Sequence, residues 1–247
     1  MKLRLLVSAT VLALSSQVQA EGQAHWSYAG NESPEHWGDL QAEYQTCKLG
    51  QNQSPVNIEP SDSKALTEPL KMEYFATTFT LENNGHTLQA NVTGKAPTIS
   101  LNDKVYVLKQ FHFHTPSEHT VKGQHYPLEI HFVHQAEDKS LAVLAVMVEE
   151  GKANPLLAQL VAKPLAKGEK EALAQPFEVG NLFPKDMTRF RLTGSLTTPP
   201  CSENVAWRIF QQPIQADKAQ ISAFNKIFGQ NNRPLQPLNK RHIEVDK

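Results

Sequence analysis

The residues best suited to chemistry in this sequence are crowded into the segment QFHFHTPSEH, from Gln110 to His119. The segment holds three of the ten histidines of the chain and one glutamate. His112 and His114 are two residues apart, so on a β-strand both side chains project from the same face, with Gln110 behind them. Taken alone, such a pair is more often an ordinary polar strand face than a metal site.

A second segment, EIHFV, supplies a third imidazole. Glu129, His131 and Val133 share one side of a strand by the same alternation. If the two strands are antiparallel neighbours, His131 lies beside the first pair and three imidazoles converge. Three nitrogen ligands leave one position of a tetrahedral zinc ion open to water, which is typical of catalytic zinc, whereas structural sites fill all four positions. Glu129 is placed to hold the second ring nitrogen of a ligand histidine.

Three further histidines nearby fit this site less well. His119 follows a Thr-Pro pair that should end the first strand. His134 is an odd number of residues from His131 and should face the other side of its strand. His125 falls in a turn region. We expect structural or surface roles for these three, and His119 is a candidate buried partner for a carboxylate.

The segments that would position these residues read mostly as strands. In residues 79–92, the dipeptide Asn84-Gly85 predicts a hairpin between two short strands. Three later segments are rich in β-branched and aromatic residues and are separated by turn residues: 104–114, 127–135 and 141–150.

The sequence predicts few helices, and we expect them at the periphery of the domain. Residues 154–162 begin with Asn154 as N-cap and a proline at the first helical position. Residues 217–229 begin with Asp217 as N-cap and end at Gly229. The pattern as a whole predicts a mainly β domain with short peripheral helices.

Length and composition agree with one large domain. The chain has 247 residues, of which 40% are hydrophobic and 20% charged, and its formal net charge is −1. These values are typical of a soluble globular protein. They indicate neither nucleic acid nor a membrane surface as a partner.

The first twenty residues have the layout of a secretory signal peptide. Lys2 and Arg4 precede an apolar run over residues 5–14, and a small residue, Ala20, ends the segment. The apolar run is about half the length of a membrane span. We therefore expect residues 21–247 to form the exported domain, in the periplasm or fully secreted.

Export affects how the two cysteines are interpreted. An oxidising compartment favours a disulfide between Cys47 and Cys201, with no thiol left over. Two buried free thiols are the alternative.

Together these motifs resemble the α-class carbonic anhydrases, in particular the bacterial branch. The segment SEHTVKGQHYPLEIHFV (117–133) follows the family signature. The likeness covers essentially all of residues 21–247, and its other motifs come in the family's order: HWSYAGNESPEHW (25–37), GQNQSPVNI (50–58), NNGH (83–86), FHFH (111–114), GSLTTPPCSENVAW (194–207) and NNRPLQPL (231–238). The resemblance implies a large central twisted sheet, mostly antiparallel.

The resemblance also implies a zinc enzyme that hydrates carbon dioxide reversibly to bicarbonate and a proton, by attack of zinc hydroxide. Its zinc ligands would be His112, His114 and His131. Three residues would support the ligands: Gln110, Glu129 and His119, the last through a buried hydrogen bond to Glu129. Thr197 would accept a hydrogen bond from the hydroxide and donate its own proton to Glu118.

Substrate and proton sites follow from the same resemblance. His86 would shuttle the proton to solvent, with Tyr28, Asn84 and Gln89 ordering the water chain; Gln89 departs from the usual asparagine. Carbon dioxide, bicarbonate, and inhibitory sulfonamides and anions would be the small-molecule partners. The residues around the substrate would be Val133, Val143, Leu196, Thr197, Thr198, Val205 and Trp207.

Other expectations concern departures and alternatives. The short TPS link after His114 should leave a wider cleft than in animal relatives, which puts inhibitor selectivity in doubt. A side esterase activity and a monomer or homodimer are expected. One alternative is a cupin-type metal enzyme, whose second motif the EIHFV segment does not match. The other is a non-catalytic carbonic-anhydrase-like binding protein, against which the presence of all three ligand histidines argues.

Overall fold

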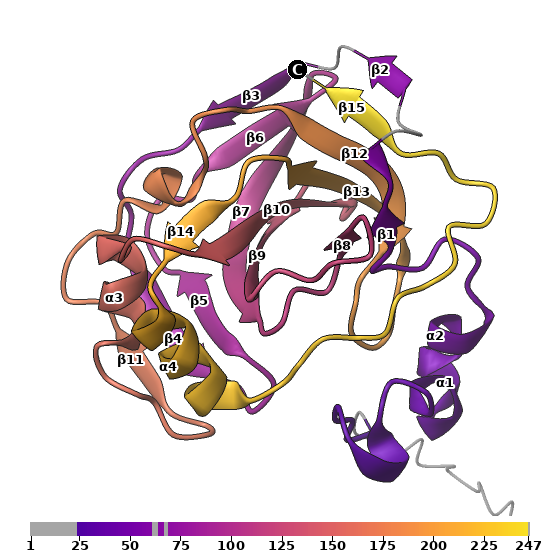
Figure 1. Cartoon of the computed structure of the whole chain (residues 1–247), viewed down its shortest axis with the longest axis horizontal. Helices are drawn as coiled ribbons and strands as arrows, with labels where there is room; N and C mark the ends of the chain where they lie inside the picture. Colours follow the sequence, from indigo (N-terminus) through magenta and orange to yellow (C-terminus); the bar gives the residue numbers. More distant parts are fainter. Residues whose placement is uncertain (1–23, 61–63, 67–68, 247) are drawn as a thin grey trace, which may run out of the picture.

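Residues 24–60, 64–66 and 69–246 are described by the computed structural model of the chain (Figure 1). The expected signal peptide, residues 1–20, lies outside this part. Among the helices of the described part, none is long and apolar enough to cross a membrane.

A 13-stranded sheet runs through the centre of the molecule (Figure 1). Most of its strand pairs are antiparallel, and three pairs, β10–β13, β10–β14 and β15–β2, are parallel. The strands along its main path, in spatial order, are β11 (Lys170–Ala172), β4 (Phe79–Asn83), β5 (Leu88–Val92), β7 (Lys104–His114), β9 (Leu128–Gln135), β10 (Leu141–Glu150), β13 (Glu203–Phe210), β12 (Arg189–Ser195), β15 (Glu244–Asp246) and β2 (Lys64–Leu66). The mainly β, mostly antiparallel prediction is confirmed.

Shorter strands extend or accompany this sheet. β14 (Ile214–Ala216) pairs with β10, and β6 (Thr98–Leu101) pairs with both β7 and β3 (Leu70–Glu73). A separate parallel pair joins β1 (Asn57–Ile58) to β8 (Thr120–Val121).

The strands that carry the histidines match the predicted segments closely. β7 and β10 have the predicted bounds, and β9 begins one residue later because Pro127, which has no N–H for the ladder, precedes it. The hairpin expected at Asn84-Gly85 joins β4 to β5, and Gly85 adopts a positive φ of 86° that suits glycine.

The helices are short and lie around the sheet. α3 (Pro155–Val161) and α4 (Lys218–Phe228) begin at the predicted N-caps: Asn154 accepts from the N–H of Leu156, and Asp217 forms a capping box with Gln220. Several one-turn elements were not predicted, because four residues are too few to show a helical period. They are α1 (Trp37–Leu40), α2 (Thr46–Leu49) and the 3-10 turns Gly30–Glu32, Ala42–Tyr44 and Val179–Leu182.

Side-chain alternation on β7 and β9 separates the main core from the candidate site. One face of both strands packs into the largest apolar cluster, through Phe111, Phe113, Leu128, Ile130 and Phe132. The opposite face carries Gln110, His112, His114, Glu129, His131 and Val133. The main core therefore fixes the strands from behind, while the polar residues gather on the other side.

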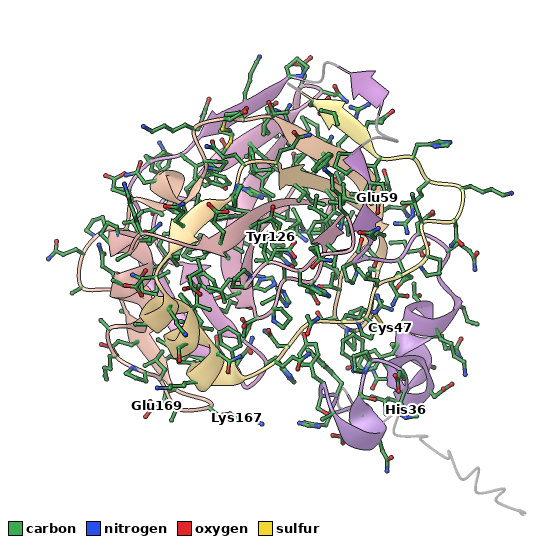
Figure 2. The ribbon with its side chains drawn as sticks, in the orientation of Figure 1. His36, Cys47, Glu59, Tyr126, Lys167 and Glu169 are labelled. Atoms are coloured by element: carbon green, nitrogen blue, oxygen red, sulfur yellow. A yellow bond between two sulfur atoms is a disulfide. The ribbon has the colours of Figure 1, made fainter. Side chains whose placement is uncertain are left out.

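The predicted disulfide is present. Cys47, on α2, is bonded to Cys201, which precedes β13, across a sequence separation of 154 residues (Figure 2). Both cysteines are buried with Trp37 and Tyr44 in a small cluster. The bond thus ties the N-terminal segment to the turn that carries Thr197.

Candidate metal centre

Three imidazoles meet where β7 and β9 run side by side. His112 and His131 are direct partners in the antiparallel register. Their ring centroids lie 5.3 Å apart, and the ring of His114 lies 5.0 Å from that of His112 and 4.5 Å from that of His131. One nitrogen from each ring lies within 4.8 Å of the others. The predicted convergence of the three histidines is confirmed.

Each of these rings has one nitrogen hydrogen-bonded to a protein acceptor. Nδ1 of His112 lies 2.8 Å from Oε1 of Gln110, and Nε2 of His131 lies 2.8 Å from Oε1 of Glu129. Nδ1 of His114 lies 2.9 Å from the carbonyl oxygen of Asn231. Since all three acceptors lack a proton to give, these nitrogens must donate, and the other nitrogen of each ring keeps its lone pair.

His112 and His114 are held in the protonation state that a metal ligand needs. Burial holds the pKa of His112 well below its ordinary value and lowers that of His114, and the neighbouring imidazoles add to both shifts. Neutral imidazole is the form that binds metal. Nε2 of His114 is buried and has no hydrogen-bond partner, although such atoms are normally paired. A set of three nitrogen donors with an orphaned lone pair fits zinc.

A second group of possible ligands, His119, Glu129 and His131, lies next to the first. These side chains are hydrogen-bonded to one another: Oε1 of Glu129 lies 2.8 Å from Nδ1 of His119 and 2.8 Å from Nε2 of His131. Oε2 of Glu129 accepts the backbone N–H groups of Glu118 and His119. Burial raises the pKa of Glu129, but the charges and hydrogen bonds of the two histidines outweigh it and leave the pKa well below normal. This group therefore supports His131, and the expected contact between His119 and Glu129 is present.

Glu118 and Thr197 are both buried, and the carboxylate of Glu118 lies beside the imidazoles of His114 and His131. Oε1 of Glu118 accepts the N–H of Arg233 at 2.9 Å, and Oε2 lies 3.5 Å from Nε2 of His114 with no hydrogen-bond partner. Among the described residues, no hydrogen bond joins Thr197 to Glu118, contrary to the expectation from the sequence. The free carboxylate oxygen faces the ring nitrogens instead, so it is not engaged by the hydroxyl.

The apolar residues expected around the substrate lie together. Val133 is the register partner of Val143, which in turn pairs with Trp207 on β13. The Trp207 ring lies 4.9 Å from that of His131. Leu196 and Val205 belong to the same cluster, and Thr198 follows on the turn before the disulfide, where its carbonyl accepts the N–H of Cys201. An apolar wall therefore stands directly beside the histidines.

His86 lies on the β4–β5 turn and is half-buried. Its ring stacks on Trp26, with centroids 3.8 Å apart and an interplanar angle of 10°. Burial, followed by the charges of His25 and Lys167, lowers the pKa of His86 from its ordinary value. The ring thus remains an uncharged proton acceptor near neutral pH.

The residues expected to order water have separate contacts. Oδ1 of Asn84 accepts the N–H of His86 and so shapes the turn. Gln89 is the register partner of His112 on β5, and its amide donates to Asn91. The Tyr28 ring packs edge-on against two tryptophans, and burial raises its pKa well above the ordinary value.

Two functional residues were not assigned from the sequence. The backbone carbonyl of Asn231 accepts from the ring of His114, and its side-chain oxygen accepts from the backbone N–H of Thr115. Its side-chain amide donates to the backbone carbonyl of His86 at 2.9 Å. The guanidinium of Arg233 donates to the backbone carbonyls of Cys47 and Ser54 and to the side-chain oxygen of Gln53. The backbone N–H of Arg233 donates to the carboxylate of Glu118. Both belong to the NNRPLQPL motif, but they are more than 100 residues from their partners in sequence, so no local period marks them.

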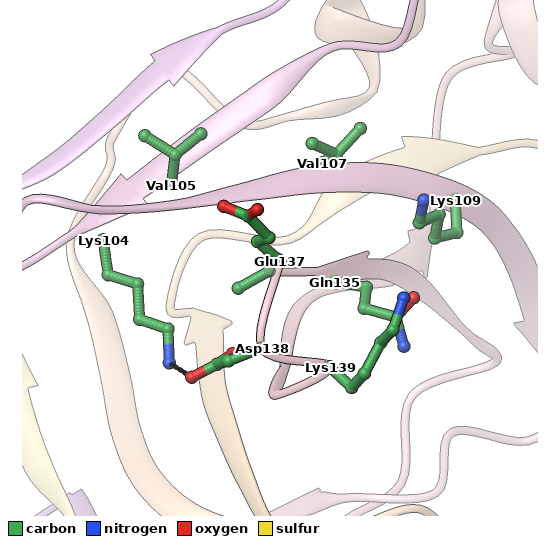
Figure 3. A pocket seen from close by; sticks show the side chains of 9 residues that line it. Lys104, Val105, Val107, Lys109, Gln135, Glu137, Asp138 and Lys139 are labelled. Carbon is green, nitrogen blue, oxygen red and sulfur yellow. Dashed lines mark hydrogen bonds and ion pairs between the residues drawn. The ribbon is translucent and has the colours of Figure 1, made fainter.

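His134 and His125 lie where the sequence predicts, the first from strand alternation and the second from its turn region. His134 faces the main core, where its Nε2 lies 2.6 Å from the hydroxyl of Tyr74. His125 is exposed, with Nδ1 2.6 Å from the carbonyl of Ser117. A surface hollow of about 750 Å³ near the first residues of β7 is likewise separate from the histidines; Lys104, Val105, Lys109 and Asp138 line it (Figure 3).

Comparisons with known proteins agree with this geometry. The family model for eukaryotic-type carbonic anhydrase matches residues 32–247. A carbonic anhydrase from Neisseria gonorrhoeae is 45% identical over 89% of this chain and 87% of its own length, and one from Klebsiella pneumoniae is 44% identical over 96% and 98%. The solved structure of α-carbonic anhydrase from Thermovibrio ammonificans with the inhibitor sulfanilamide covers 90% of this chain and 100% of its own, at 44% identity and a TM-score of 0.87.

Proposed function

The chain belongs to the α-class carbonic anhydrases, and on that premise we propose how its residues divide the work of hydrating carbon dioxide. The observation that carries the proposal is the convergence of three imidazoles whose outer nitrogens are all engaged. Only one nitrogen of each ring is left to bind a common metal ion.

We propose that this ion is zinc, and that its ligands are Nε2 of His112, Nε2 of His114 and Nδ1 of His131. When bound by three histidines, zinc lowers the pKa of a water molecule to about 7, the established case for carbonic anhydrases. Gln110, Glu129 and the Asn231 carbonyl keep the three rings in the ligating orientation.

Thr197 and Glu118 would select and aim the attacking group. An ionised Glu118 can only accept, so a hydroxyl that donates to it has only lone pairs left. Thr197 would then accept a hydrogen bond from a protonated group at the open fourth position and orient it toward the substrate carbon. The unpartnered Oε2 of Glu118 supports this role, because it is available to the hydroxyl once a cation occupies the space beside His114.

Carbon dioxide carries no charge, so an apolar surface is the site suited to it. We propose that it lies on the wall formed by Val133, Val143, Leu196, Val205 and Trp207, with Thr198 at its edge. The Trp207 ring lies 4.9 Å from that of His131, which supports this location for the substrate.

His86 would carry the released proton to solvent. A half-buried imidazole with a lowered pKa accepts a proton and returns it quickly near neutral pH. Tyr28, Asn84 and Gln89 would order the intervening water.

Further proposals concern the setting of the enzyme. The relative from Thermovibrio ammonificans binds sulfanilamide, and we propose that this chain also binds sulfonamides and small anions. The disulfide supports export to the periplasm or beyond after removal of residues 1–20. A side esterase activity, and a monomer or homodimer, remain proposals.

The proposal is tested by stopped-flow carbon dioxide hydration before and after metal removal by a chelator. Activity should disappear with the metal and return on addition of about one equivalent of zinc per chain. Full activity in metal-free protein would refute the proposal, and stoichiometric zinc without turnover would favour a binding protein.

A further inference from the structure

A second histidine lies beside His86, in a hollow that opens to solvent. The hollow has a volume of about 440 Å³, and its lining includes His25, Trp26, His86 and Lys167. The rings of His25 and His86 have centroids 6.4 Å apart. The side chain of His25 is 62% exposed, whereas His86 is half-buried. The pair therefore runs from the partly enclosed ring to open solvent.

The hydrogen bonds of His25 leave it able to accept a proton. Its Nδ1 lies 2.9 Å from Oε2 of Glu32. Because a carboxylate accepts, Nδ1 carries the hydrogen of the neutral ring and Nε2 keeps a lone pair. Nε2 makes no hydrogen bond to the described residues.

The separation of the two rings suits transfer through water. At a centroid distance of 6.4 Å the ring nitrogens are too far apart for a direct hydrogen bond of about 3 Å. One water molecule can bridge such a gap between two polar groups. His86 has no side-chain hydrogen bond to the described residues, so its ring nitrogens are open to such a water.

Charges around the hollow favour movement of a proton outward. The titratable groups that line it are His25, Tyr28, His86 and Lys167. The stem of Lys167 packs against Gly85, where a Cβ atom would come within 2.5 Å of Cε. Its ammonium has no lone pair and opposes positive charge on His86. Glu32, in contrast, provides a negative counter-charge at His25.

We propose that His25 is an outer proton-transfer residue, which takes the proton from His86 through one bridging water and passes it to buffer. The inference rests on the proposed role of His86. The His86 imidazolium gives one proton to the water, and the water gives one proton to Nε2 of His25. A buffer base then removes one proton from His25, so that both rings return to the neutral form.

The test measures kcat and kcat/KM for carbon dioxide hydration across a range of buffer concentrations. The variants are His25→Gln, His86→Ala and the double variant. His36→Gln serves as the matched control, because His36 is also exposed on the N-terminal segment and its side chain makes no capping hydrogen bond (Figure 2). Proton export follows the attack on carbon dioxide, so its loss lowers kcat and leaves kcat/KM unchanged.

In weak buffer, we expect His25→Gln to lower kcat roughly two- to fivefold, less than the loss of a full general acid–base group. Concentrated imidazole should restore kcat, and the control should match the parent protein. In the double variant, His25→Gln should add nothing to the effect of His86→Ala.

Three results overturn the inference in different ways. If His86→Ala slows turnover but His25→Gln does not, the role of His25 is wrong and that of His86 stands. If neither variant changes kcat in weak buffer, the proposed shuttle itself is wrong. If His25→Gln lowered kcat/KM as much as it lowered kcat, the effect would be structural, which would also refute the inference.

Discussion

His112 and His131 face each other directly across the antiparallel pair β7–β9, with ring centroids 5.3 Å apart. Each ring is also held from behind, His112 by Gln110 and His131 by Glu129. All four side chains come from the same face of two neighbouring strands. Strand register thus determines both which imidazoles meet and which nitrogens they present.

Loss of the amide behind His112 should weaken metal binding without removing a ligand. We expect Gln110→Ala to lower zinc affinity about 10- to 100-fold, the usual cost of losing a partner of a ligand histidine. Competition with a chromogenic chelator measures this change. Gln135→Ala is the control, since Gln135 lies at the far end of β9, on the hollow of Figure 3; equal affinities of the two variants would refute the role of Gln110.

The hydroxyl of Thr197 should matter for the attack on carbon dioxide rather than for holding the metal. We expect Thr197→Val to lower kcat/KM by about 10²-fold, the scale of one lost transition-state hydrogen bond, while zinc content stays unchanged. Thr197→Ser keeps the hydroxyl and should retain most of the activity. Stopped-flow kinetics of both variants decides, and parent-like turnover of the valine variant would exclude the proposed hydrogen bond.

The charge of Lys167 should contribute to the pH at which His86 accepts protons. His86 must be neutral to accept, and its pKa lies below the ordinary 6.5 because of burial, His25 and Lys167. Lys167→Gln removes one of the charges that oppose protonation, so the pKa should rise and the midpoint of kcat against pH should move upward. An unchanged midpoint, or one that moves downward, would contradict this electrostatic role.

Buried His134 should make the protein sensitive to acid. Burial lowers its pKa from 6.5 to about 3. Between these values the unfolded chain binds a proton that the folded chain does not, so stability falls as the pH drops, by up to about 1.4 kcal/mol per pH unit. His134→Phe should flatten this part of the curve of unfolding free energy against pH, measured by urea denaturation. A slope identical to that of the parent would show that other groups account for the acid response.

The disulfide should contribute to stability through its long loop. We expect the variant Cys47→Ser, Cys201→Ser to lose about 2–5 kcal/mol of unfolding free energy; the chain-entropy model gives about 5 kcal/mol as the upper end for a loop of this length. Denaturant unfolding of the oxidised parent, the reduced parent and the variant measures it. Equal stability of all three would mean that packing around Trp37 and Tyr44 suffices to hold the two segments.

The strands and ligands of this fold were predictable because their information is local. Alternation over β7 and β9 marks which histidines share a face, and it placed His134 on the other side, where it meets Tyr74. The contacts that complete the site are not local. Asn231 reaches His114 across 117 residues, and no periodic pattern connects them.

Strand geometry could predict neither the roles of Thr197 and His86 nor the helix α2. The roles of Thr197 and His86 come from resemblance alone, and among the described residues no hydrogen bond joins Thr197 to Glu118. The one-turn helix α2, which carries Cys47, was too short to show in the sequence. Turns and side-chain orientation in loops depend on tertiary packing, which a single sequence does not reveal.

Anomalous X-ray diffraction at the zinc edge, on crystals of the purified protein, tests the central claim most directly. We predict one zinc ion bonded at about 2.0–2.1 Å to the ring nitrogens of His112, His114 and His131, with a fourth, non-protein ligand. A metal held instead by His119 and Glu129, or three imidazoles that point apart around no metal in active protein, would contradict the account.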